Sequence, residues 1–141
     1  MIKSPEHAIK LARKNPHQTN TLRVLCLCSV GMLRSPTLAN ELNRIHGLNT
    51  RSCGVTTSHA LVPVSEALLH WADELVFVDF DAYNEFTEND NNKNVLNMLR
   101  NQGTVVYVLN VPDVYDWNDT ELKTISVNQY FERKKFMMEI E

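Results

Sequence analysis

The stretch LCLCSVGMLRSPT, from Leu25 to Thr37, decides the fold because a strand pattern changes into a helix pattern within it. Its first residues end an almost continuous apolar run, Thr21 to Cys28, which is typical of a strand buried on both faces. The Ser35-Pro36 pair near its end is typical of a helix start, and a helix is predicted from Pro36 to His46. The segment after Cys28 is therefore predicted to connect a buried strand to a helix.

Strand and helix patterns alternate along the rest of the chain. Apolar, β-branched runs predict further strands at residues 74–80 and 104–111, and a weaker one at 49–55. Helix patterns occupy residues 65–72, 81–88, 94–101 and 119–138. This alternation favours an open parallel α/β sheet with right-handed crossovers. The asparagine-rich residues 89–94 are predicted to form a solvated loop between two of the helices.

The length of 141 residues favours a single domain, which we expect to comprise residues 21–141. Residues 1–20 are predicted to be an N-terminal extension that forms a short helix. Ser4 is a typical N-cap, and Pro5 suits the first position of a helix. No internal repeat and no second domain is apparent in the sequence.

Charge and cysteine content exclude several classes of protein. The net charge is −3 and no long basic stripe is present, so neither nucleic acid nor an anionic membrane surface is an expected partner. The three cysteines lack a metal-type Cys-x-x-Cys spacing, and the histidines lack a ligand spacing, so no metal site is predicted. Without an apolar segment of a signal peptide or a membrane span, the sequence favours a reduced, cytoplasmic protein.

The topology of a parallel sheet is expected to bring two distant residues together. The carboxyl ends of all its strands point to one edge. Cys28 follows the first strong strand and Asp113 follows the last, so both are expected at this edge although 85 positions separate them. Parallel strands lie about 4.8 Å apart, so a short loop bridges one or two strand spacings. We therefore expect Cys28 and Asp113 to share a site.

The loop after Cys28 has the composition of an anion site. Its backbone N–H groups surround an oxyanion if the loop curls, and the following helix adds its positive end. A thiolate held among such donors is a nucleophile, which predicts Cys28 as the reactive residue. Arg34 presents a planar fork to two oxygens of a phosphoryl group, and Gly31 suits a left-handed turn. The predicted anion-binding residues are Ser29, Val30, Gly31, Met32, Leu33 and Ser35, whose hydroxyl we also expect to bond the thiolate.

These motifs resemble the low-molecular-weight protein tyrosine phosphatases. CSVGMLRSPT, residues 28–37, looks like the Cys-x5-Arg-Ser phosphate loop of that family, and RSCGV, residues 51–55, resembles its second strand. VPDVYDWND, residues 111–119, is similar to the family's Asp-Pro-Tyr loop, with Asp113 at the general-acid position and Tyr115 at the tyrosine. The resemblance implies a four-stranded parallel sheet with helices on both faces, the phosphate loop between the first strand and its helix, and no metal or organic cofactor.

The sequence departs from this family at four places. Gly31 replaces an asparagine that braces the loop, Leu33 replaces a second cysteine, and Val114 replaces the proline after the general acid. The segment after the second strand, residues 56–63, lacks the aromatic residue that walls the phosphotyrosine ring. If Gly31 has a positive φ, we expect alanine there to damage the loop and asparagine to be tolerated better.

Two assignments within the site remain open in the sequence. Asp113 is assigned as general acid and base, with Tyr115 lining the entrance, while Asp119 is a rival acid and otherwise the N-cap of the last helix. Cys28 is the expected nucleophile, although Cys26 or Cys53 has a possible role as its redox partner.

Three functions are compatible with these residues. The first is a cysteine-dependent phosphatase that acts on a phosphorylated protein, plausibly on phosphotyrosine, or on a small phosphomonoester. The second is a noncatalytic module that binds phosphate or a phosphoprotein. The third is an arsenate reductase, which needs additional cysteines to carry electrons, and none follows Cys53. The sequence identifies neither the physiological substrate nor the oligomeric state.

Overall fold

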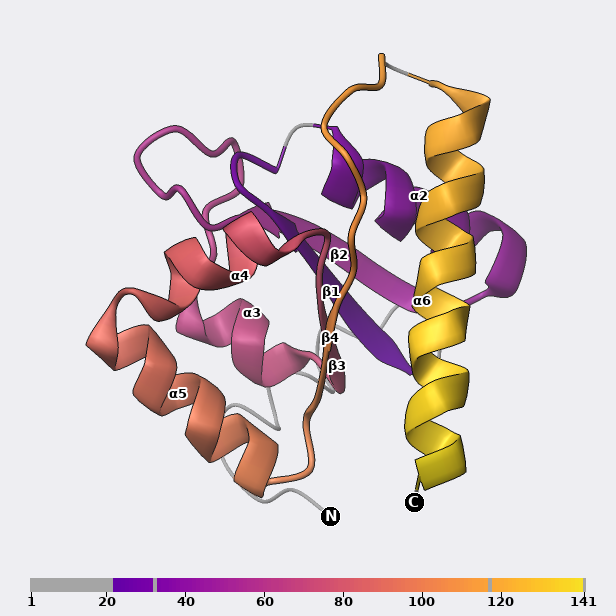
Figure 1. Cartoon of the computed structure of the whole chain (residues 1–141). Helices are drawn as coiled ribbons and strands as arrows, with labels where there is room; N and C mark the ends of the chain where they lie inside the picture. The colour runs from indigo at the N-terminus through magenta and orange to yellow at the C-terminus, as the bar shows by residue number, and fades with distance from the viewer. Residues whose placement is uncertain (1–21, 32, 117, 141) are drawn as a thin grey trace.

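The computed structural model describes residues 22–31, 33–116 and 118–140, and the predictions for residues 1–20 and for Met32 lie outside this part of the chain. Figure 1 labels its helices and strands. In chain order the elements are β1 (Arg23–Cys28), α2 (Arg34–His46), β2 (Asn49–Gly54), α3 (Glu66–Trp71), β3 (Glu74–Phe77), α4 (Phe80–Thr87), α5 (Asp90–Asn101), β4 (Val105–Val108) and α6 (Thr120–Ile140).

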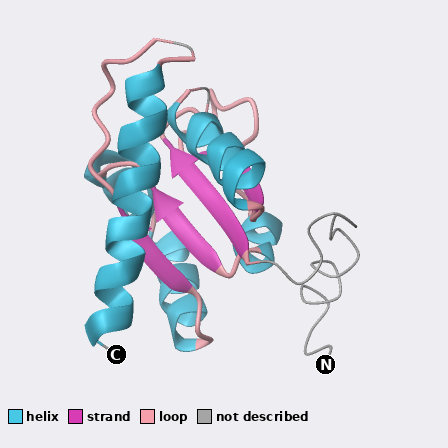
Figure 2. Ribbon diagram, turned by 90° about the vertical axis from the view of Figure 1, so that its right-hand side faces the viewer, coloured by secondary structure: helices cyan, strands magenta, loops and turns pink. Residues whose placement is uncertain are grey.

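The four strands form one parallel sheet in the order β2-β1-β3-β4. Their arrowheads point to the same edge (Figure 2). At this edge Cys28 pairs with Gly54 of β2, and Leu27 pairs with Phe77 of β3. The predicted α/β fold with a four-stranded parallel sheet is therefore confirmed, and β1 lies in the middle of the sheet with the Cys28 loop, residues 28–34, at its carboxyl end.

Helices cover both faces of the sheet, which explains the continuous apolar pattern of β1. Helices α2 and α6 lie on one face, and α3, α4 and α5 lie on the other (Figure 1). Leu25 and Leu27 are buried on the side of α3 to α5, whereas Val24 and Cys26 are buried on the side of α2 and α6. A strand with apolar side chains on both faces is stable only between two such layers.

One sequence prediction was wrong at the start of α5. Residues 89–94 were expected to be a loop, but the helix begins at Asp90. The Asn89 side chain accepts a hydrogen bond from the Asn92 backbone at 3.1 Å and so caps the helix. Asparagine is a favourable N-cap, and the burial of Val95 and Leu96 in the following turns holds the helix against the sheet.

Helix α6 is the longest helix, with 21 residues, and it packs against α2. Leu122, Ser126 and Tyr130 recur every four positions and are fully buried, so they form the stripe that faces the protein. Within the part of the chain that the structure describes, no helix combines the length and the hydrophobicity that a membrane span requires.

Candidate active site

The sulfur of Cys28 lies among hydrogen-bond donors at the carboxyl end of β1. Its Sγ atom is 3.0 Å from the Ser35 hydroxyl, and the backbone N–H of Gly31 donates to it at 3.0 Å. The side chain is nearly buried, with 4% of the residue exposed. When Cys28 is a thiolate it has no proton to donate, so the Ser35 hydroxyl must then be the donor of this contact. Both groups stabilise a negative charge on the sulfur.

Gly31 is in the left-handed region, with φ of +77°, and it lies against the backbone of β2. A Cβ atom at this position would be 2.8 Å from the backbone of both Cys53 and Gly54. Gly54 is equally constrained, because its Cβ atom would be 2.5 Å from the backbone of Val30. The loop thus rests directly on the end of β2. Asparagine tolerates the positive φ at position 31, but its Cβ atom would meet the same backbone as that of alanine. The advantage that the sequence predicted for asparagine over alanine is therefore reduced.

The N-terminus of α2 has the properties of an anion site. The helix begins at Arg34, two residues earlier than predicted, and its N-cap residue Leu33 makes no side-chain capping bond. The first N–H groups of a helix have no partner within the helix, and they carry its positive partial charge. A negatively charged group in the Cys28 loop is therefore stabilised from this side as well.

Arg34 is held by one nitrogen. Its Nη1 atom donates to the carboxylate of Asp79 and, at 2.9 Å, to the carbonyl oxygen of Val111. Its Nε atom lies 3.7 Å from a carboxylate oxygen of Asp113. Among the described residues, neither Nε nor Nη2 has a hydrogen-bond partner. The edge formed by these two atoms has the planar fork geometry that suits two oxygens of an anion such as a phosphoryl group.

Asp79 is the functional residue that the sequence analysis missed. It follows β3 as the N-cap of α4, where one of its oxygens accepts a hydrogen bond from the Ala82 backbone at 2.8 Å, while the other binds Arg34. The predicted strand at residues 74–80 included Asp79 and so concealed it, whereas β3 ends at Phe77 and α4 begins at Phe80. An acidic residue between a buried strand and a helix, at the edge where the other site residues were expected, is the signal that could have found it.

The structure places the two candidate acids in different surroundings. Asp113 lies beside Arg34, and 73% of its side chain is exposed. Asp119 uses its carboxylate to accept hydrogen bonds from the backbone of Glu121 and Leu122, at 2.8 and 3.4 Å, and thus caps α6. A carboxylate that caps a helix is fixed by the helix backbone. Asp113 is the one of the two that lies beside Arg34.

Tyr115 lies on the same loop as Asp113 and contacts α6. Its ring packs against the apolar cluster between α6 and the sheet. Desolvation raises the pKa of its hydroxyl, and the neighbouring Glu121 and Asp119 carboxylates raise it further. The hydroxyl of Tyr115 is therefore directed towards the start of α6, and its predicted position at the entrance of the site stays a prediction.

The loop after β2 is hydrogen-bonded to the Cys28 loop and to α4. The backbone N–H groups of Val55 and Thr56 donate to the carbonyls of Cys28 and Ser29, at 2.9 and 2.7 Å. The Thr56 hydroxyl donates to Glu85 of α4. Four large apolar side chains are exposed in the segments that follow β2, β3 and β4 at this edge of the sheet: Leu61, Val62 and Val114 on loops, and Phe80 at the start of α4.

All three cysteines are free thiols. Burial raises the pKa of Cys53 to about 12, with a further contribution from the charge of Cys28. Burial is also the main cause that raises the pKa of Cys26. A protonated, buried thiol is a poor nucleophile. The redox pairing of Cys28 with either residue stays a prediction.

Within the described residues, the histidine, cysteine and acidic side chains form no group of three or more that suits a metal ion. The groups that surround the Cys28 sulfur are hydrogen-bond donors, which suit an anion instead.

The comparisons with known proteins agree with the predicted fold. No protein-family model and no curated protein matches the sequence. Among solved structures, the chain is similar to the low molecular weight protein tyrosine phosphatase from T. tengcongensis, with a TM-score of 0.52 and 14% sequence identity. The similarity covers 84% of this chain and 99% of that protein. The fold that the sequence resemblance implied is confirmed by this similarity.

Proposed function

We propose that this protein is a cysteine-dependent phosphomonoester hydrolase. The observation that carries the proposal is the position of the Cys28 sulfur, 3.0 Å from both the Ser35 hydroxyl and the Gly31 N–H, in the loop that leads into Arg34. A nucleophile, an uncapped helix N-terminus and a guanidinium edge meet at one point. Together they suit the attack of a thiolate on the phosphorus of a bound phosphate ester.

The first step transfers the phosphoryl group to the enzyme. The Cys28 thiolate attacks phosphorus, an S–P bond forms, and the bond from phosphorus to the ester oxygen breaks. Asp113, in its protonated form, gives its proton to the departing oxygen. The exposed side chain of Asp113 beside Arg34 supports this role, because it has room to move over a bound phosphoryl group.

The second step releases inorganic phosphate. Asp113, now a carboxylate, accepts a proton from a water molecule whose oxygen attacks phosphorus, and the S–P bond breaks. The electron pair of that bond returns to sulfur, so the leaving group is again the Cys28 thiolate. The hydroxyl of Ser35 donates to this thiolate and makes it a better leaving group.

Arg34 binds the phosphoryl oxygens, and Asp79 sets its orientation. The Asp79 carboxylate and the Val111 carbonyl hold Nη1, which leaves the edge with Nε and Nη2 for two phosphoryl oxygens. The guanidinium keeps these bonds while charge moves in the transition state, and such fixed donors are a major source of rate enhancement. The backbone of residues 29–35 binds the remaining oxygens in this proposal.

The substrate is, we infer, an ester with an apolar leaving group, such as phosphotyrosine in a protein. The exposed side chains of Leu61, Val62, Phe80 and Val114 support this inference. Phe80 directly follows Asp79 and is exposed, so it is a candidate for the aromatic contact that residues 56–63 do not offer. Tyr115 is a further candidate for contact with the substrate.

The two alternative functions make different demands on the chain. An arsenate reductase needs accessible cysteines that carry electrons, whereas Cys26 and Cys53 are completely buried. A noncatalytic phosphate-binding module needs only the loop and Arg34. A measurement of hydrolysis distinguishes this alternative from a phosphatase.

The proposal is tested by hydrolysis of p-nitrophenyl phosphate. We expect turnover by the wild-type protein, inhibition by vanadate, and no turnover by Cys28→Ser. Cys53→Ser is the matched control, because it removes a thiol from the neighbouring strand and leaves the nucleophile in place. Absence of turnover in the wild type, with phosphate binding retained, would identify a noncatalytic module. Turnover by Cys28→Ser would disprove the cysteine mechanism.

The role of Asp113 is tested by comparing the effect of its substitution on substrates with poor and with good leaving groups. Asp113→Asn is expected to lose about 10²–10⁴-fold in kcat/KM for phenyl phosphate, whose leaving group needs a proton. The loss for 2,4-dinitrophenyl phosphate, whose leaving group does not, is expected to be much smaller. Asp119→Asn is the control, and a larger selective loss in that variant would reverse the two assignments.

A further inference from the structure

The loop that carries Asp113 is fixed firmly at its beginning. The side-chain amide of Gln129, on α6, forms two hydrogen bonds with the backbone of Asn110, at 2.6 and 3.0 Å. The next residue, Val111, donates its N–H to the carbonyl of Val78 at 2.9 Å, and its own carbonyl accepts from Arg34. The loop therefore leaves the sheet from a fixed position.

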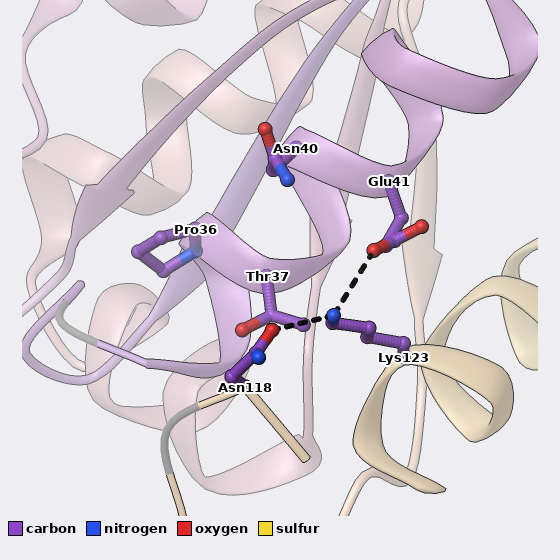
Figure 3. A pocket seen from close by; sticks show the side chains of 6 residues that line it. All are labelled: Pro36, Thr37, Asn40, Glu41, Asn118 and Lys123. Carbon is purple, nitrogen blue, oxygen red and sulfur yellow. Dashed lines mark hydrogen bonds and ion pairs between the residues drawn. The ribbon is translucent and has the colours of Figure 1, made fainter. Parts of the chain in front are cut away.

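The end of the same loop is held by Lys123. Asn118 has a positive φ of 64°, and its side-chain oxygen accepts a hydrogen bond from Lys123 Nζ at 2.6 Å. The same ammonium group lies 3.8 Å from a carboxylate oxygen of Glu41 on α2. Figure 3 shows Lys123 between these two partners. One cation thus joins the end of the loop to α2.

Glu41 is a rigid partner for this cation. It is 2% exposed, and its two oxygens also accept hydrogen bonds from Arg44, at 3.3 and 3.0 Å. Glu41 belongs to the helix whose first residue is Arg34. Lys123 therefore connects the Asp113 loop to the helix that presents the phosphate-binding guanidinium.

Apolar packing does not replace this contact. A pocket of about 80 Å³ lies between the first turns of α2 and the end of the loop. Figure 3 shows the side chains around it, which are Pro36, Thr37, Asn40, Glu41, Asn118 and Lys123. Between the two fixed ends, Asp113, Val114 and Asp116 are exposed, whereas Tyr115 packs against the apolar cluster between α6 and the sheet. The loop is therefore held by polar contacts at its two ends and by the ring of Tyr115 between them.

We propose that Lys123 is a positioning residue for Asp113. By bonding Asn118 and pairing with Glu41, it keeps the loop at the distance from Arg34 at which the Asp113 carboxyl reaches the oxygen of the leaving group. This inference rests on the proposed function, since it assigns a purpose to the loop only if Asp113 transfers protons. It predicts that loss of the Lys123 contacts weakens proton transfer and leaves phosphate binding intact.

Two substitutions remove the contact from opposite sides. Lys123→Met removes the charge and keeps the aliphatic chain, while Glu41 retains Arg44 as its partner. Asn118→Gly removes the amide, and glycine suits the positive φ at this position, so the backbone is not strained. Each variant is expected to lose about 3–10-fold in kcat/KM for phenyl phosphate, which is part of the full effect of the acid, and less than about 2-fold for 2,4-dinitrophenyl phosphate.

Three further measurements separate positioning from general damage. The double variant is expected to lose no more than either single variant, because both remove the same contact. Amide hydrogen exchange of residues 113–116 is expected to be faster in both variants, whereas the affinity for inorganic phosphate is unchanged. Lys135→Met, at an exposed position of the same helix, is the matched control and is expected to behave as the wild type.

Some results would overturn the inference and leave the proposed function intact. If the wild type is active and Asp113→Asn shows its leaving-group dependence, but Lys123→Met and Asn118→Gly do not, Lys123 has no positioning role. Equal losses on both substrates, or a loss of phosphate affinity, would likewise contradict it. Failure of the proposed function is recognised separately, by an inactive wild type or an active Cys28→Ser variant.

Discussion

Two clusters of buried polar groups lie along the same sheet, and they differ in how completely their members are bonded. The Glu74 cluster consists of Glu74, Tyr107, Tyr130 and Lys134. Both carboxylate oxygens of Glu74 accept hydrogen bonds from tyrosine hydroxyls, and Lys134 Nζ lies 3.4 Å from one of them. The Arg34 cluster consists of Arg34, Asp79, Asp113 and the carbonyl of Val111. There one guanidinium nitrogen carries both hydrogen bonds, and the edge beside it faces an exposed carboxylate.

The difference indicates separate roles for the two clusters. A buried charge that is fully bonded adds to a single, rigid packing arrangement and offers nothing to a ligand. The Nε and Nη2 edge of the Arg34 guanidinium makes no hydrogen bond to the described residues, so it is available to a bound anion. We therefore expect the Glu74 cluster to affect stability and the Arg34 cluster to affect chemistry, which the following predictions test.

The largest effect is expected for Arg34→Lys. An ammonium group keeps the charge and can remain beside Asp79, but it lacks the planar fork for two phosphoryl oxygens. We expect kcat for p-nitrophenyl phosphate to fall on the order of 10²–10³-fold, with a change of less than about 1 kcal/mol in the free energy of unfolding. Steady-state kinetics and urea denaturation measure the two quantities.

The same substitution at Arg100, on the exposed side of α5, is the control for Arg34→Lys and is expected to leave kcat unchanged. Near-normal turnover by Arg34→Lys would contradict the assignment of the guanidinium edge as the phosphoryl clamp.

Glu74→Gln is expected to have a smaller effect, and on stability rather than on activity. The amide has one oxygen where the carboxylate has two, so one of the two tyrosine hydroxyls loses its acceptor and the charge opposite Lys134 is removed. We expect the free energy of unfolding to fall by about 1–3 kcal/mol. At denaturant concentrations below the midpoint of unfolding of this variant, its kcat/KM is expected to stay within 2-fold of the wild-type value.

Glu132→Gln, at an exposed position of α6, makes the same chemical change outside the cluster and is expected to leave stability unchanged. The comparison between the two clusters fails if Glu74→Gln reduces kcat/KM strongly while the protein remains folded.

The smallest effect concerns alkaline pH. Burial raises the pKa of the Cys26 thiol, and the charges of Cys53, Cys28 and Glu74 add to it. Above pH ~8.5 the unfolded chain releases this proton while the folded protein keeps it, so this contribution to stability is complete below that pH and falls as the pH rises. The expected slope is at most about 1.4 kcal/mol per pH unit for each such thiol.

Urea denaturation between pH 8 and pH 10 measures this slope. Cys26→Ala is expected to make it shallower, although the variant is less stable at pH 8 because it leaves a small cavity. An unchanged slope in this variant would mean that folding does not raise the pKa of the Cys26 thiol.

Much of the fold was predictable because its signals are local. The apolar run that ends at Cys28 predicted a central strand, and its two-sided burial confirms this. Residues 49–55 gave a weaker pattern because β2 is an edge strand, in which the side chains of Thr50, Arg51 and Ser52 are only partly buried. The start of α5 was missed because an asparagine-rich segment favours loops and helix caps alike, and only its packing decides between them.

Individual residues of the candidate site were predictable from the sequence, but the contacts between residues from distant elements were not. Cys28 and Arg34 are close in the sequence, so the loop between them was recognisable as an anion site. Asp79, in contrast, reaches Arg34 only because β3 lies beside β1 in the sheet. No local sequence pattern predicts the order of the strands. The choice between Asp113 and Asp119 likewise needed the start of α6, which uses Asp119 as its cap.

The sequence by itself determined the alternation of strands and helices and the common edge for Cys28 and Asp113, because periodicity and parallel topology dictate them. The anion site after Cys28 stays a prediction. Only the tertiary structure decided which atoms of Arg34 face the site and which helix holds the end of the Asp113 loop. The Lys123–Glu41 pair joins α6 to α2 across 82 positions of sequence. Such contacts depend on how whole elements pack, because the same residue types also occur on solvated helix faces, where they have no fixed partner.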